Sequence, residues 1–129
     1  MGTGEEFQEI GNDELWKSAL QTYAEADYFE VHEILEELWR RTAGDEARFY
    51  QGMLQAAVAL HHYCNGNFHG AKLLAERAPG KLEGLPDDYF GIDLGRFKKE
   101  FEVTMAPVFE RKDGLEPLDP ADAPEIVPV

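Results

Sequence analysis

The chain has 129 residues, which suits one domain, and 43% of them are hydrophobic, so an ordinary globular core is expected. Its 26 acidic and 12 basic residues give a net charge of −14, which repels phosphate and excludes nucleic acid and anionic membrane surfaces as expected partners. One cysteine, Cys64, allows no intrachain disulfide, and because no apolar run has the length of a signal peptide or a membrane span, a cytoplasmic location is expected.

The first two helices are predicted after a flexible N-terminal segment, residues 1–11. Leucine, alanine and aromatic residues then follow at helical spacing, and Asp13 is expected to cap this first helix. Asp27 and Glu30 form the D-x-x-E pattern of a capping box, which predicts the start of a second helix. Two arginines and then Gly44 mark its end, because basic residues suit the negative pole of a helix and glycine suits the stop.

A third helix is predicted over about residues 45–64, and it has no charged residue between Phe49 and Cys64. Apolar residues cover nearly its whole circumference, which predicts a buried helix at the centre of the fold. The run N-G-N that follows is typical of a turn. Gly66 suits a left-handed C-cap, and Asn67 can cap a fourth helix.

The last two helices and the tail are set off by prolines and acidic residues. Pro79 is expected to bend or shorten the fourth helix, Asp93 opens a fifth helix after a loop, and Pro107 should disturb the last turn. Residues 113–129 form an acidic, proline-rich tail, expected to be extended or disordered. Strand signals are nearly absent, so residues 12–112 are predicted to form an all-α, single-domain bundle of about five helices.

Three residues of the second helix form a stripe that has the character of a site. His32, Glu36 and Trp39 stack along one side of the helix at a spacing of four and three residues. A projection at about 100° per residue places His32 and Glu36 at the border between the apolar arc and the solvent arc. His32 is therefore expected to be partly buried, beside Trp39.

The third helix carries a matching polar strip, made of Gln51, Gln55 and His62, while His61 is expected to point elsewhere. A buried amide left without a partner costs about 1–3 kcal/mol, so these side chains need polar partners. Consecutive helices joined by a short loop usually pack antiparallel. The sequence therefore predicts one polar pocket between the second and third helices.

Histidine and glutamate at positions i and i+4 can bind one divalent transition metal, such as zinc, from a single helix. His32, Glu36 and His62 are the predicted ligands, and Glu33 is the candidate general base. The run H-E-I-L-E departs from the H-E-x-x-H protease motif, since Glu36 replaces the second histidine, so no protease is inferred. The remaining pocket residues are then Trp39, Gln51 and Gln55.

Several segments together resemble the domain of unknown function 309 family, over roughly residues 15–97. His32, Glu36 and Trp39 match its H-x-x-x-E-x-x-W/Y motif. The resemblance implies an all-helical fold and a motif suggested to bind metal, and some members carry the label of metal-dependent hydrolase. The matching segments are "YFEVHEILEELWR", "FYQGMLQAAVALHHYCNGNFHGAKLLAERA" and "YFGIDLGRF".

Two functions stay open at this stage. In the first, the interhelical pocket is a metal site with hydrolase activity on an unidentified small-molecule substrate. In the second, the chain is a non-enzymatic interaction or scaffold module, in which the polar network only fixes the helix register and the protein forms a homo-oligomer. The first predicts bound metal that depends on His32, and the second predicts none.

Overall fold

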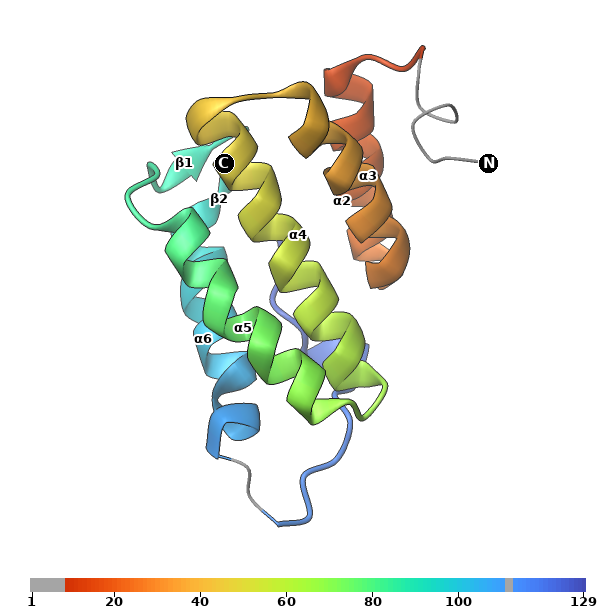
Figure 1. Ribbon diagram of the computed structural model, residues 1–129, viewed down its shortest axis with the longest axis vertical. Coiled ribbons are helices and arrows are strands. Elements are labelled where there is room, and N and C mark those ends of the chain that lie inside the picture. Colours follow the sequence, from red (N-terminus) through yellow and green to blue (C-terminus); the bar gives the residue numbers. More distant parts are fainter. Residues whose placement is uncertain (1–8, 111–112) are drawn as a thin grey trace.

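The computed structural model describes residues 9–110 and 113–129, and this part of the chain forms five α-helices and one small hairpin (Figure 1). The predicted all-α, single-domain bundle is therefore confirmed. Most of the predicted flexible N-terminal segment, residues 1–8, lies outside the described residues. The helices are α2 (Asn12–Ala24), α3 (Tyr28–Arg41), α4 (Gly44–Cys64), α5 (Phe68–Leu82) and α6 (Leu94–Glu110).

Helix α4 lies at the centre of the bundle, between α3 and α5, as Figure 1 shows. Its buried residues are spread around most of the helix, because neighbours cover it on several sides. The prediction of a central buried helix is confirmed. The buried side chains of α4 include Phe49, Tyr50, Met53, Ala56, Ala57, Ala59, Leu60 and Tyr63.

Two predicted N-caps are present. The side chain of Asp27 accepts a hydrogen bond from the backbone N–H of Glu30 at 3.3 Å, at the start of α3. Asn67 does the same for the N–H of Gly70 at 3.0 Å, at the start of α5. The turn before Asn67 needs a left-handed residue, and Gly66 supplies it with φ of 77°. Local chemistry therefore fixes where these two helices begin.

Two other predicted boundaries were wrong. Gly11, not Asp13, is the N-cap of α2, and Asp13 lies in the first turn, where its charge still suits the positive helix pole. Gly44 is the first residue of α4 and does not end α3, which stops at Arg41. The φ of Gly44 is 63°, so glycine is used here to start a helix at a sharp change of direction.

The prolines in α5 and α6 do not end their helices. Pro79 and Pro107 lie inside α5 and α6, and each helix continues past its proline. A proline in the last turns removes one hydrogen bond only, and the residues beyond it can still gain from burial. Leu82 and Val108, which follow the two prolines, are both buried.

The segment before α6, predicted as loop, contains a short antiparallel hairpin of β1 (Asp88–Tyr89) and β2 (Ile92–Asp93). Phe90 and Gly91 form its turn with φ of 50° and 75°. Both residues are left-handed, as the favoured two-residue hairpin turns require. The period-2 signal was too short to be recognised in the sequence.

The tail, residues 113–129, follows an extended path against the bundle and includes one short 3-10 turn, η1 (Pro120–Asp122). Its backbone pairs with the hairpin, since Asp93 N–H donates to Val127 O at 2.7 Å and Val129 N–H donates to Gly91 O at 3.0 Å. The Tyr23 hydroxyl donates to the carbonyl of Pro124. The tail is thus held by α2 and by the hairpin.

Candidate functional site

Four side chains follow one another along the outer side of α3: Phe29, His32, Glu36 and Trp39, here named the α3 stripe. Their spacing of three and four residues keeps them on one helix face. Phe29 is 52% exposed and Trp39 is 39% exposed, so both ends of the stripe carry a large aromatic side chain in contact with solvent. Trp39, predicted as a pocket residue, is the last residue of this stripe.

The centre of the stripe is a pair that the sequence predicted. Nε2 of His32 lies 3.3 Å from Oε2 of Glu36. The other oxygen of Glu36 accepts a hydrogen bond from Arg40 Nη2 at 3.1 Å. The carboxylate is therefore shared between a histidine and an arginine on the same helix face. Because all three side chains are partly exposed, solvent screens these interactions and each contributes little to stability.

Helix α4 adds His61 to the stripe, not His62. The ring of Phe29 lies 5.6 Å from the ring of His32 and 5.6 Å from the ring of His61, measured between centroids. Adjacent residues on a helix point about 100° apart, so only one of two consecutive histidines can face α3. The helical projection of the sequence gave the angle between His61 and His62 correctly, but the prediction assigned His62 to the side of α4 that faces α3, where His61 lies.

His62 faces α5. Its Nδ1 lies 3.3 Å from Nδ2 of Asn67, and its Cδ2 lies so close to Gly70 that a Cβ there would approach to 3.0 Å. Burial, together with the neighbouring His61, lowers the pKa of His62. The ring is therefore neutral at neutral pH, and it helps to pack the start of α5 against the end of α4.

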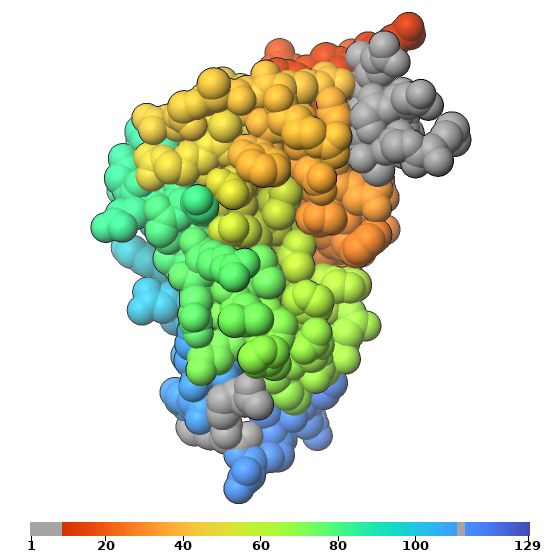
Figure 2. Space-filling view, viewed as in Figure 1, coloured from red at the N-terminus to blue at the C-terminus, as the bar shows by residue number. Residues whose placement is uncertain are grey.

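The two glutamines also lie away from the stripe. Gln55 is 9% exposed and falls on the face of α4 that includes Gly52 and His62, both of which contact α5. Gln51, which is about 20° from His62 in the helical projection, is partly exposed. The single predicted pocket is thus divided. Figure 2 shows α4 side chains reaching the surface between α3 and α5.

Two buried polar atoms, one on α3 and one on α4, have no hydrogen-bond partner among the described residues. Nδ1 of His32 and Oε1 of Gln55 are buried, and neither has a hydrogen-bond partner within residues 9–110 and 113–129. An unpaired buried polar atom costs free energy, so such atoms are often found where a ligand or another chain supplies the missing partner. Both side chains lie on elements that border the surface over α4.

The predicted metal ligands do not converge. His32 and Glu36 lie together, whereas His62 is turned toward α5 and contacts Asn67. In the part of the chain that the structure describes, no three or more histidine, cysteine, aspartate or glutamate side chains are grouped so that they could hold one metal ion. Because the three residues do not fit a shared metal, no reaction step is derived through one. Glu33, the candidate base, is half-buried on α3.

Cys64, at the end of α4, is not an activated nucleophile. Burial raises the pKa of its thiol, and the negative charge of Asp119 raises it further. The thiol is therefore protonated at neutral pH, whereas nucleophilic chemistry needs the thiolate.

Among the described residues, none of the helices combines the length and the apolar composition that crossing a bilayer requires.

The residues missed by sequence reasoning are Phe29 and His61. Phe29 could have been found, because it stands three residues before His32 and so continues the same helix face. His61 had no comparable signal, since its role depends on how α4 is rotated against α3. Together these features define a small all-α domain with a polar and aromatic helix face.

Comparison with known proteins identifies the family. Residues 16–74 match the model of the family described as a domain of unknown function (DUF309), so the family predicted from the motifs is confirmed for this segment. The match includes most of α2, all of α3 and α4, and the start of α5. It therefore contains the whole α3 stripe and both adjacent histidines.

Two relatives are themselves uncharacterized. An uncharacterized protein of Aquifex aeolicus (strain VF5) is 33% identical over 93 residues, which are 71% of this chain and 28% of that protein. The uncharacterized protein YpuF of Bacillus subtilis (strain 168) is 45% identical over 95 residues, which are 71% of this chain and 52% of that protein. The chain thus spans about half of one relative and about a quarter of the other.

Proposed function

We propose that this domain is a non-enzymatic interaction module that associates with a second copy through the α3 stripe. The observation that carries the proposal is the pair of exposed aromatic side chains, Phe29 and Trp39, at the two ends of one helix face. Exposed aromatic residues grouped on a surface mark contact sites, and tryptophan is among the residues that contribute most to binding.

The chemistry of the stripe is self-complementary. In a two-fold symmetric dimer with antiparallel α3 helices, two positions face each other across the interface when they lie equally far from the residue nearest the symmetry axis. Positions 29 and 39 are each five residues from position 34, and positions 32 and 36 are each two residues from it. Phe29 of each copy would thus meet Trp39 of the other, and His32 would meet Glu36.

The size of the stripe sets the extent of the contact. Ten residues of helix span only about 15 Å, and one helix face of that length is too small to bury the roughly 800 Å² per partner of a standard interface. The contact therefore needs part of α4 as well, where the partly exposed His61 lies beside Phe29.

Sedimentation velocity over a range of concentrations tests this function. We expect a monomer–dimer equilibrium for the native chain and a monomer for F29S/W39S, because the double variant removes both aromatic contacts. Phe29 and Trp39 are exposed, so circular dichroism should show an unchanged fold. V103S removes a still more exposed apolar side chain from α6 and should leave dimerisation unchanged. A native chain that stays monomeric at every concentration contradicts the proposal.

A metal-dependent hydrolase is the second candidate, and it is favoured by the 3.3 Å contact between His32 and Glu36. It requires a third ligand, for which His62 would have to turn away from Asn67, and Glu33 would act as the base. Elemental analysis of protein purified without a histidine tag separates the candidates. About one equivalent of zinc or a similar metal, lost in H32A, supports the hydrolase, because a catalytic site binds one ion through three protein ligands.

A further inference from the structure

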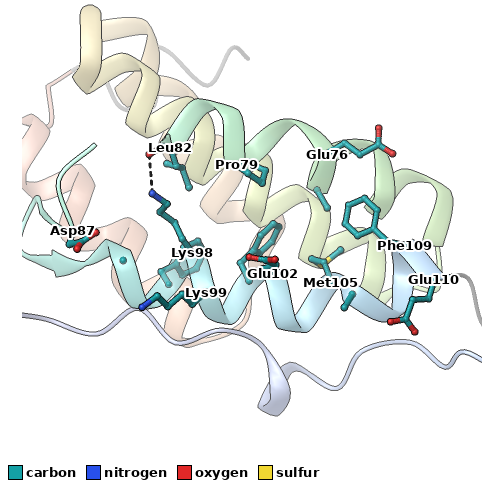
Figure 3. A pocket seen from close by; sticks show the side chains of 15 residues that line it. Glu76, Pro79, Leu82, Asp87, Lys98, Lys99, Glu102, Met105, Phe109 and Glu110 are labelled. Carbon is teal, nitrogen blue, oxygen red and sulfur yellow. Dashed lines mark hydrogen bonds between the residues drawn. The ribbon is translucent and has the colours of Figure 1, made fainter. Parts of the chain in front are cut away.

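A second surface lies on the opposite part of the bundle, between α5 and α6. A groove of about 870 Å³ opens there, as Figure 3 shows in close-up. Leu82, Phe101 and Met105 form its apolar floor, and they are buried. Phe109, which is 42% exposed, and Pro79 stand at the rim. The groove therefore has a closed apolar base and an exposed apolar edge.

The shape of the groove suits a helix. Its lining follows α6 from Gly95 to Glu110, a length of about 22 Å or roughly four helical turns at 1.5 Å per residue. Side chains along its walls are small at Gly95, Ala106 and Ala75, which keeps the groove open between the two helices. A helix lying along α6 can place an apolar side chain over the floor at each turn.

Acidic residues outnumber basic ones along the groove, which is lined by Glu76, Asp87, Glu102 and Glu110 together with Lys98 and Lys99. Glu76 on α5 and Glu102 on α6 stand on its two sides, both exposed, and neither forms a salt bridge with another residue that the structure describes. Lys98 lies at one end and donates to the carbonyl of Leu82 at 3.5 Å. Carboxylates on both helices that border an apolar floor complement a ligand with an apolar face and positive flanks.

We propose that this groove binds an amphipathic helix of a partner protein, with lysine or arginine residues on both sides of its apolar stripe. Leucine-like side chains would lie on Phe101, Met105 and Phe109, and the basic residues would pair with Glu76 and Glu102. The occupant is a helix of another protein, because this chain has 26 acidic and only 12 basic residues and so lacks the excess of positive charge that the groove walls would attract. The α3 stripe is not involved, so the two surfaces can be occupied independently.

Binding of a model peptide tests the proposal. The probe is a fluorescently labelled helix of about 14 residues with leucine at i, i+3, i+4 and i+7 and lysine elsewhere. Fluorescence anisotropy with the full chain at physiological salt gives the affinity. We expect E76K/E102K to weaken binding about tenfold, since two surface ion pairs are lost. F109S should also weaken it, because the apolar rim is removed.

A matched variant separates the groove from the overall negative charge. E14K/E25K changes the net charge by the same amount at exposed positions in α2 and at its C-cap, and we expect binding to stay within twofold of the native chain, about the effect of one weak surface ion pair. If both double variants weaken binding equally, the peptide is attracted to net charge alone and the proposal is overturned. If F109S changes the sedimentation of the chain by itself, a second copy occupies the groove, which also overturns it.

Discussion

Gly52 is the residue at which the packing of α4 against α5 is tightest. A Cβ added there would lie 2.6 Å from Cδ2 and 2.8 Å from Cγ of Leu82, and 3.0 Å from Cβ of Lys81. Leu82 is 2% exposed, so it has little room to move away. Gly52 therefore has a packing role: it lets two helices approach closely.

G52A should accordingly destabilise the domain by about 1–2 kcal/mol, because the clash outweighs the gain in helix propensity from alanine. Urea denaturation followed by circular dichroism measures the change in the free energy of unfolding. Gly80 on α5 provides the control, since nothing lies within 4 Å of a Cβ placed there. G80A should stabilise the domain by up to about 1 kcal/mol. A G52A variant as stable as G80A would contradict this account of the contact.

At the scale of helices, the sequence predicted their number, type and starting points better than their rotation. Asp27 and Asn67 cap through their own backbone neighbours, so a few adjacent residues contain the whole signal. The hydrophobic period likewise fixes which arc of α3 is apolar. These features are local, and they could be read without knowing which helix packs where.

Which residues of α4 lie at the candidate site depends on contacts between helices, and these contacts cannot be read from a few adjacent residues. His61 and His62 differ by about 100° on α4, and the choice between them depends on which neighbour lies on each side. That choice is made by the contacts of Gly52 with Leu82 and of His62 with Asn67, which place α5 on the His62 side. The pair His32 and Glu36 was predictable because both residues belong to one helix turn.

At the scale of the whole molecule, the tail closes the fold. Pro124 is buried, and Ile126 packs against the core. Glu100 on α6 accepts hydrogen bonds from Nε of Arg96 at 2.6 Å and from the backbone N–H of Glu125 at 3.0 Å. One carboxylate thus joins α6 to the tail, although the chain carries 26 acidic residues that repel one another.

The Glu100 contact predicts a pH dependence of stability. The hydrogen bond from Arg96, followed by that from the Glu125 N–H, lowers the pKa of Glu100. A carboxylate whose pKa is lower in the folded state stabilises that state above its unfolded pKa, which is about 4.3. This stabilisation is lost as the pH falls through the folded pKa. The free energy of unfolding should therefore exceed that of E100Q at pH 7, and the difference should vanish in acid.

Urea denaturation of both chains at pH values from about 7 to about 3 measures this difference, since that range includes the pKa of a glutamate. E102Q supplies the control: Glu102 is exposed on the same helix and has no salt bridge with another described residue, so its difference from the native chain should not depend on pH. Amide exchange adds a local reading, because E100Q should speed the exchange of the Glu125 N–H in the tail. A difference for E100Q that is constant with pH would show that Glu100 stabilises the tail by packing alone, without its charge.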